Sequence, residues 1–396
     1  MKKLTEDNIR LLTYCVLTVV VCWFLLVYCK YDYLHAEQFR MFRYSWDYAA
    51  PLLTSVNGAF TLLADFITQF YINPVWAALL NAVIFLFMTL AVDGILKKIL
   101  PGYLLPFFAL LAGLETVIYL TRIDCNMEGV LMLLAGLGIC CLLLHFWKGK
   151  IILPSPKKQK LRLGIGGVLV LCAFWTGLQL FVKQHPAQST RLKVQEVMRW
   201  QEDWDGILSL PYMKTMPNVL YAAYQNLALA EKGMLGEDWS KYPQVGENGL
   251  WYVTTGQQFE YMLLSDIYYI QGNVAQAQMM AFNGLYYSSR MATPHLLERL
   301  IETNLIYGAD KVAEKYISLL EETLFYKDKA ASYRQFLGHA EKLKADARLG
   351  KLKEITDKLD GYDSGIVHDL EAIHAACPDY KPAADYLNAY HQLSEK

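Results

Sequence analysis

The first half of this chain is dominated by apolar segments long enough to cross a lipid bilayer. A spanning helix needs roughly 20 apolar residues, because each residue rises about 1.5 Å through about 30 Å of hydrocarbon. Five segments meet this length, at about 11–29, 74–96, 103–121, 127–147 and 163–183. The sequence therefore predicts a transmembrane helical domain over residues 1–183.

A sixth apolar segment, at about 53–71, is shorter than the other five and carries Asp65 and Gln69. Its pattern is amphipathic, which does not favour a simple span. We interpret 53–71 as a re-entrant helix or as a helix lying in the outer interface. This choice determines on which side of the membrane the second half of the chain lies.

The positions of the positive charges give the orientation of the spans. Lys and Arg are enriched in cytoplasmic connectors. In this chain, Lys and Arg precede the first span, and Lys97 and Lys98 follow the second. The linker between the fourth and fifth spans, at 148–162, is rich in Lys and carries no acid. Five spans satisfy all three constraints, whereas six would put the linker outside. The N-terminus is therefore predicted in the cytoplasm and residues 184–396 on the outer side.

The second half of the chain predicts a domain of stacked helices. From about Thr190, amphipathic helices of 12–18 residues alternate with Gly, Pro and Asn breaks. Four residues recur after 36 positions: Leu264, Ile270, Gly272 and Ala277 return as Leu300, Ile306, Gly308 and Ala313. The tetratricopeptide repeat has a similar period of about 34, with a glycine near the turn between its helices. We therefore predict an all-α fold, with a transmembrane bundle over 1–183 and a tetratricopeptide-like repeat domain over 184–396.

Less regular helices flank the repeat. The segments WQEDWDGILSL and VLYAAYQNLALAEKGML predict an earlier helical pair, and the loop Tyr242–Gly249 interrupts the array. A single further helix is expected for ASYRQFLGHAEKLKAD, and a last helical pair for IVHDLEAIHAACPDYKPAADYLNAYHQL.

Composition excludes several classes of protein. The chain has 37 Lys and Arg against 38 Asp and Glu, which does not suit a basic nucleic-acid binder. Only Cys377 lies in the second half, so that domain cannot form an internal disulfide. His and Cys do not occur at the spacings of metal sites, and we predict neither a metal nor another cofactor.

Three acidic residues are candidates for catalysis. Glu37 and Asp47 lie on the first outer connector, and Glu115 lies in the outer half of the span at 103–121. An ionisable residue inside a span is costly and is commonly functional. Lining one outer-facing cavity, these acids can hold a divalent ion or act as a general base. The alternative, which we favour, is that Glu115 pairs with Arg122 or stays hydrated near the interface.

Four tyrosines are candidates for binding a protein partner. Stacked helix pairs leave a concave surface that commonly binds another protein. Tyr261, Tyr268, Tyr286 and Tyr307 are candidates for lining it. A tyrosine at helical spacing is more often part of a core, and that alternative stays open.

The chain resembles a group of uncharacterised multi-pass membrane proteins of Bacteroidetes. The resemblance is carried by the segments NLALAEKGML, YPQVGENGL, SDIYYIQGNVAQAQMMAFNGL and EQFRMFRYSWDY. The resemblance covers nearly the whole chain. It implies a bacterial inner-membrane protein with a tetratricopeptide-like periplasmic domain. It also implies that the chains of the relatives extend beyond the position of YLNAYHQL. It implies no activity and transfers no catalytic residue.

Two functions follow as hypotheses. The first is a scaffold in the membrane whose periplasmic helices bind a protein partner of the cell envelope. The second rests on a resemblance of the membrane half to membrane glycosyltransferases that use lipid-linked sugars, which place acids on their first outer loop. Here Glu37 and Asp47 have that position.

Overall fold

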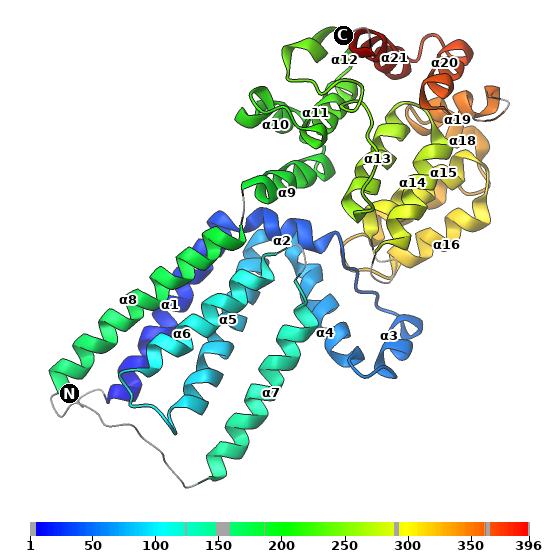
Figure 1. The fold of residues 1–396 in the computed structure, drawn as a ribbon. Coiled ribbons are helices and arrows are strands. Elements are labelled where there is room, and N and C mark those ends of the chain that lie inside the picture. Colours follow the sequence, from blue (N-terminus) through cyan, green and yellow to red (C-terminus); the bar gives the residue numbers. More distant parts are fainter. Residues whose placement is uncertain are drawn as a thin grey trace. The chain divides into compact units, whose positions relative to one another are not determined.

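The computed structural model describes residues 5–122, 125–147, 159–185, 187–288, 293–359, 361 and 365–394. Every regular element in these ranges is a helix, apart from one isolated bridge between Val245 and Glu247. The chain divides into two compact units (Figure 1). The membrane unit comprises residues 1–37 and 46–191, and the helical unit comprises residues 38–45 and 192–396.

The membrane unit contains the long apolar helices of the chain. Its elements are α1 (Glu6–Tyr28), α2 (Lys30–Glu37), α3 (Trp46–Leu53), α4 (Gly58–Thr68), η1 (Gln69–Ile72), α5 (Pro74–Leu96), α6 (Leu105–Leu120), α7 (Met127–Phe146) and α8 (Gln159–Gln184). In this part of the chain, α1, α5, α7 and the segment Gly164–Gln184 of α8 are long and apolar enough to cross a membrane. These four helices indicate a membrane protein. The segment predicted as a span at 103–121 forms the shorter apolar helix α6, so the number of five spans stays a prediction. The Lys-rich linker falls mostly on residues 148–158, outside the described ranges.

Local sequence explains where the spans begin. Asn73 precedes α5, and its side-chain oxygen accepts a hydrogen bond of 2.9 Å from the backbone N–H of Val75. Asn126 caps α7 in the same way, accepting from Gly129 at 2.8 Å. Such caps satisfy N–H groups that have no partner within the helix.

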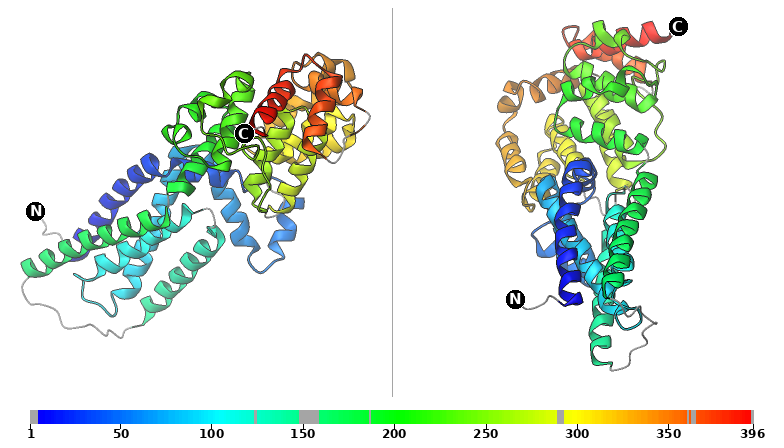
Figure 2. Two further views of the ribbon diagram at one scale, coloured as in Figure 1. Left: turned by 45° about the horizontal axis from the view of Figure 1, so that its top comes forward. Right: turned by 90° about the vertical axis from the view of Figure 1, so that its left-hand side faces the viewer.

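Close packing around α5 builds the membrane unit. This helix packs against α1, α6 and α7, and α6 also packs against α8, so that the long helices run side by side (Figure 2). Gly113 lets α6 approach α5 closely, because a Cβ there would lie 2.8 Å from Cδ2 of Phe85. Near the other end of α5, Asp93 accepts hydrogen bonds from Tyr14 Oη at 2.8 Å and pairs with Arg10 Nε at 2.7 Å.

The segment 53–71 forms a short helical hairpin with its neighbours. Helix α4 packs against α3 and against α7. Within the hairpin, Tyr48 Oη donates a hydrogen bond to the buried carboxylate of Asp65. This carboxylate therefore has a partner inside the protein, and the re-entrant or interfacial position of the segment stays a prediction.

The helical unit is a chain of shorter helices. Its elements are α9 (Ala187–Trp200), α10 (Trp204–Ser209), η2 (Pro211–Lys214), α11 (Val219–Glu231), α12 (Leu235–Asp238), η3 (Trp239–Lys241), α13 (Gln258–Ile270), α14 (Val274–Tyr286), α15 (Pro294–Ile306), α16 (Asp310–Glu321), α17 (Lys327–Tyr333), η5 (Arg334–Phe336), α18 (Ala340–Ala345), α19 (Leu349–Lys358), α20 (Ile366–Ala376) and α21 (Lys381–Ser394).

The 36-residue repeat is visible in the helices themselves. Helices α13 and α15 each have 13 residues and begin 36 positions apart, and each is followed by a glycine turn and a second helix. Gly272 and Gly308 adopt φ values of +87° and +70°, a left-handed conformation that favours glycine. Ala277 and Ala313 are fully buried between the paired helices. The predicted turns and second helices are therefore confirmed.

One predicted helix is wrong. The segment ASYRQFLGHAEKLKAD was expected to be a single helix, but it is divided among α17, η5 and α18. Gly338 causes the break, because it adopts a φ of +70° and its N–H donates a 2.9 Å hydrogen bond to the Asp310 carboxylate. The residues that form α19 follow this segment, and no helix was predicted there.

Eight residues of the first connector pack within the helical unit. The side chain of Met41 is buried in that unit's core. The N–H of Tyr44 donates to the carbonyl of Glu322 at 2.7 Å, and Ser45 Oγ donates to the carboxylate of Glu322 at 2.7 Å. The segment 38–45 is therefore a structural part of the helical unit, although it lies far from that unit in sequence.

Candidate functional sites

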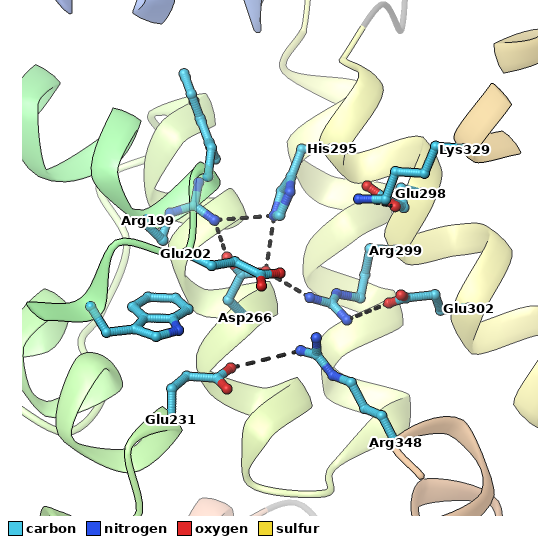
Figure 3. A pocket seen from close by; sticks show the side chains of 12 residues that line it. Arg199, Glu202, Glu231, Asp266, His295, Glu298, Arg299, Glu302, Lys329 and Arg348 are labelled. Atoms are coloured by element: carbon cyan, nitrogen blue, oxygen red, sulfur yellow. Dashed lines mark hydrogen bonds and ion pairs between the residues drawn. The ribbon is translucent and has the colours of Figure 1, made fainter. Parts of the chain in front are cut away.

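A cavity lined by charged side chains lies inside the helical unit (Figure 3). Its volume is about 90 Å³, enough to hold water molecules. Helices α9, α13 and α15 contribute most of the charged groups. The lining comprises Arg199, Trp200, Glu202, Trp204, Glu231, Asp266, His295, Glu298, Arg299, Glu302, Lys329 and Arg348.

Asp266 is the centre of this charge network. Its carboxylate accepts hydrogen bonds from Nη1 of Arg199 and, at 2.8 Å, from Nη2 of Arg299. Nε2 of His295 lies 2.9 Å from the same carboxylate. Arg199 is fully buried and also donates to Glu196 at 2.9 Å. Removing this one carboxylate would leave two buried guanidinium groups without their shared acceptor.

The second half of the network is built around Tyr269. The guanidinium of Arg299 lies 3.4 Å from the centre of the Tyr269 ring and that of Arg348 lies 4.8 Å from it, both in cation–π contact. Arg299 also donates to Glu302 at 2.7 Å, and Tyr333 Oη donates to Glu302 at 3.0 Å. Burial alone raises the pKa of Glu302, but the positive charges of Arg299 and Arg348 and the hydrogen bonds of Tyr333 and Tyr269 together outweigh burial, so the pKa is lowered.

His295 is held in its neutral form. Burial lowers the pKa of His295 well below its ordinary value, and the charges of Arg199 and Arg299 lower it further. A neutral histidine beside a carboxylate resembles the base and orienting acid of a hydrolytic site. The cavity lining, as far as it is described, has no Ser, Thr or Cys to act as nucleophile. The arrangement therefore favours a structural charge network over catalysis.

Two donors of the network have no protein partner. The Nε–H groups of Arg199 and Arg299 are buried and make no hydrogen bond to a described residue. Waters in the 90 Å³ cavity are the expected acceptors. This site was not predicted from the sequence. A signal for it was present, because one face of α15 carries His295, Glu298, Arg299 and Glu302 at helical spacing.

The four candidate tyrosines separate into two groups. Tyr261 and Tyr268 are 8% and 6% exposed and belong to the core of the helical unit, as the alternative interpretation had it. Tyr286 and Tyr307 are 80% and 42% exposed. The four residues therefore do not line one common surface.

Tyr286 belongs to an exposed apolar face of α14. Met279, Phe282 and Tyr286 lie at positions i, i+3 and i+7 of this helix and are 45%, 41% and 80% exposed. The adjacent Tyr287 is 53% exposed, and its ring contacts that of Tyr286 at a centroid distance of 5.3 Å. We call these four residues the α14 stripe.

The three candidate acids occupy three different environments. Glu37 is buried at the end of α2, whereas Asp47 is exposed in the first turn of α3. Glu115 is exposed on α6 and makes no hydrogen bond or ion pair with any described residue. The expected pair with Arg122 is not formed, because Arg122 lies two helical turns further along and places its guanidinium over the ring of Tyr119.

Glu115 lines a groove of about 540 Å³ in the membrane unit, which we call the α6–α7 groove. Its apolar part comes from Met88, Val92, Ala112, Val130, Leu133 and Leu137, and its polar part from Glu115, Thr116, Tyr119, Arg122, Asn126 and Gln184. The side-chain oxygen of Gln184 is buried there without a hydrogen-bond partner among the described residues. In the described ranges, no group of three or more His, Cys, Asp and Glu can hold a metal ion.

Comparison with known proteins gives one match. The model of a family of unknown function, DUF6057, matches residues 7–182 and 177–396, which together cover nearly the whole chain. No curated protein and no solved structure matches the chain. The match agrees with the resemblance to an uncharacterised family and supplies no activity for any of the sites above.

Proposed function

The chain belongs to the DUF6057 family of unknown function, and we propose that it is a membrane scaffold whose helical unit binds a protein partner. The α14 stripe is the observation that carries this proposal. Aromatic residues and methionine are enriched at protein interfaces, and exposed apolar patches commonly mark binding sites. Fully burying one such side chain contributes about 1.5–3 kcal/mol.

The two chain segments that form the helical unit limit the possible number of membrane crossings, because both must lie on the same side of the bilayer. Residues 38–45 directly follow α2, and residues 192–396 follow α8, yet both segments belong to this unit. The chain between them must therefore cross an even number of times. Crossings by α5, α6, α7 and α8 satisfy this condition, even though α6 has only 16 residues.

The charge bias selects among the remaining topologies. A crossing by α4 in place of α6 would also give an even number, but it would put Lys97 and Lys98 on the outer side. We therefore propose five spans, with the N-terminus in the cytoplasm and the helical unit in the periplasm of a bacterial inner membrane. In this proposal the two 36-residue units are tetratricopeptide-like and present the α14 stripe to an envelope protein.

Site-specific crosslinking in cells tests the scaffold. A photoreactive amino acid at Tyr286 of the full-length protein is expected to give one discrete adduct, and the same amino acid at the exposed Lys311 of α16 is the control. The substitution Phe282→Asp should reduce the Tyr286 adduct about tenfold, because it places a charge within the apolar contact. Equal adducts at both positions, or an adduct that Phe282→Asp leaves unchanged, would refute the scaffold.

The transferase hypothesis is retained as a second candidate because of Glu115. A carboxylate without a protein partner in an apolar groove is a candidate general base for a lipid-linked substrate. The enzyme alternative expects Glu115→Gln to abolish function in a complementation assay at unchanged protein level. The scaffold expects that variant to complement fully, so one assay separates the two functions.

A further inference from the structure

A second charged cavity lies at one end of the membrane unit, and we call it the basic cavity. Helices α1, α6 and α8 begin beside it and α5 ends beside it. Its volume is about 530 Å³. The charged part of its lining comprises Glu6, Asp7, Arg10, Lys97, Lys98 and Arg162.

The acids around the basic cavity are paired with its two arginines. Nε of Arg10 lies 2.7 Å from the carboxylate of Asp93, and Nη2 of Arg10 lies 3.0 Å from that of Asp7. Nη2 of Arg162 lies 2.9 Å from the carboxylate of Glu6. All three carboxylates therefore have an arginine partner, and none of them contacts a lysine of this cavity.

The two lysines give the basic cavity a positive charge in excess. Lys98 Nζ donates to the neutral carbonyl of Trp147 at 2.9 Å, and Lys97 makes no hydrogen bond or ion pair with a described residue. Two arginines and two lysines thus face three carboxylates, including that of Asp93. The buried Nε–H of Arg162 also has no acceptor among the described residues. A group with one negative charge and several acceptor oxygens would complement this lining.

An apolar cavity of about 260 Å³ continues from the basic cavity into the bundle. The two cavities share four lining residues, and the remaining lining of the apolar cavity is uncharged. Val170 lines its far part, eight positions after Arg162 and about 12 Å further along α8 at 1.5 Å per residue. The apolar cavity therefore reaches into the part of α8 that is apolar enough for a membrane, which begins at Gly164.

A glycine on α8 leaves room in the apolar cavity. Gly166 packs closely on the neighbouring chain, since a Cβ there would lie 3.4 Å from the carbonyl oxygen of Tyr103. Gly167 lines the cavity, and a Cβ at this position would meet no heavy atom within 4 Å. The space beside Gly167 is therefore not filled by the protein.

A phospholipid combines a phosphate head and an apolar chain in the order in which these two cavities follow one another. We propose that they bind one anionic phospholipid, with its phosphate against Lys97 and Lys98 and one acyl chain beside Gly167. Basic pockets between membrane helices commonly bind anionic headgroups. A phospholipid with an ammonium group in its head fits less well, because it adds a positive charge beside the two lysines.

This inference rests on the proposed bilayer position of α1, α5, α6 and α8 and is independent of the α14 stripe. The proposed topology puts the basic cavity at the cytoplasmic leaflet, where anionic lipids attract basic residues. The inference concerns binding alone, so it holds for a scaffold and for an enzyme.

Photolabelling in vesicles tests the site. The full-length protein is reconstituted in phosphatidylcholine vesicles that contain a lipid with a diazirine in one acyl chain and either a phosphoglycerol or a phosphocholine head. Labelled peptides are mapped by mass spectrometry. The phosphoglycerol probe should label residues 9–13 of α1, which line the apolar cavity through Ile9 and Thr13, about tenfold more than the phosphocholine probe. Equal labelling by both probes overturns the proposal.

Lysine variants test the site of the head. Replacing both lysines, by Lys97→Gln and Lys98→Gln, should remove most of the excess labelling. Lys183→Gln, at an exposed position near the other end of α8, should leave it unchanged. An excess that survives the double replacement contradicts the proposed head site. Inorganic phosphate at matched ionic strength should not reduce the excess, and a loss of the excess would assign the site to the free ion and overturn the lipid.

Glycine variants test the site of the chain. Gly167→Leu should fill the apolar cavity and lower labelling by the phosphoglycerol probe to the level of the phosphocholine probe. The matched variant Gly164→Leu lies on the same helix outside both linings, also meets nothing within 4 Å, and should keep the excess. If Gly167→Leu keeps the excess as well, the lysines only attract lipids to the surface, and the bound lipid is overturned.

A reference position separates this test from the membrane placement. Both probes should label the exposed Trp175 of α8 to the same extent. Absence of labelling at Trp175 would contradict the proposed bilayer position itself. Labelling of Trp175 with no phosphoglycerol excess at residues 9–13 would overturn the lipid site alone.

Discussion

The charged cavity of the helical unit and the α6–α7 groove of the membrane unit satisfy their polar groups in different ways. In the cavity, Asp266 and Glu302 accept from guanidinium groups supplied by other parts of the same unit. In the groove, Glu115 and Gln184 find no donor among the described residues. The paired charges of the cavity stabilise the fold, although the Nε–H groups of Arg199 and Arg299 have no partner among the described residues. The groove contains no such network of paired charges among its described residues.

The two units also differ in what holds them together. Membrane helices gain little from burying apolar surface, because lipid is as apolar as the helix, so they depend on close packing at small residues such as Gly113. The helical unit buries charges, and the cost of desolvating them is offset only while every partner is present. The comparison therefore predicts that different substitutions weaken each unit.

The largest expected effect is that of Asp266→Ala. This change leaves Arg199 and Arg299 buried without their shared acceptor, and breaking a buried pair in this way costs about 3–5 kcal/mol. Hydrogen exchange of the full-length protein should show faster exchange in α9, α13 and α15 and unchanged exchange in α5 and α6. The control Asp328→Ala removes an exposed carboxylate and should change stability by less than about 0.5 kcal/mol. Similar losses of stability for both substitutions would contradict the proposal that the charge network stabilises the helical unit.

An intermediate effect is expected in the membrane unit for Gly113→Ala. The added methyl group would contact the ring of Phe85 at 2.8 Å, and overpacking of this kind typically costs about 1–3 kcal/mol. The matched substitution Gly136→Ala on α7 meets nothing within 4 Å, so it should be neutral or stabilise the helix by up to about 1 kcal/mol. Thermal unfolding in detergent measures both variants. Equal stability of the two would contradict the close packing of α5 and α6.

The smallest expected effect is a pH dependence confined to the helical unit. The pKa of His295 is lower in the folded protein than in the unfolded chain, so the unfolded chain binds the proton first as the pH falls. The contribution of His295 to stability is complete above about pH 6.5 and is lost below it, by up to about 1.4 kcal/mol per pH unit. Glu302 acts in the same direction, but only below its ordinary pKa of about 4.5.

Unfolding at pH 7.5, 6.5 and 5.5 measures this effect. The variant His295→Gln should lose less stability between pH 6.5 and 5.5 than the natural chain does. Identical slopes would show that folding does not lower the pKa of His295, which would contradict its assigned neutral state.

Much of the helical architecture could be predicted from local sequence. The helix α5 begins and ends where hydropathy placed a span, at residues 74 and 96. The 36-residue repeat correctly located the turns at Gly272 and Gly308. Hydropathy and turn conformation depend on residues close together in the sequence, so the local sequence is sufficient to predict them.

The sites were less accessible to such reasoning. Helical spacing put Glu115 and Arg122 on one face and suggested a pair, but two helical turns separate them and Arg122 lies over Tyr119 instead. Likewise, the break at Gly338 depends on an acceptor at Asp310, 28 residues earlier. Each outcome was decided by a neighbour that the local pattern does not contain.

The sequence by itself determined that this protein is helical, that its first half contains apolar helices long enough for a membrane, and that its second half repeats. Only the tertiary structure decided which charges meet. Arg199, Asp266 and Arg299 come from α9, α13 and α15, and the residues 38–45 join a unit whose other members begin at residue 192. Helix formation depends on hydrogen bonds between residues four positions apart, whereas the partner of a buried charge depends on how distant helices pack.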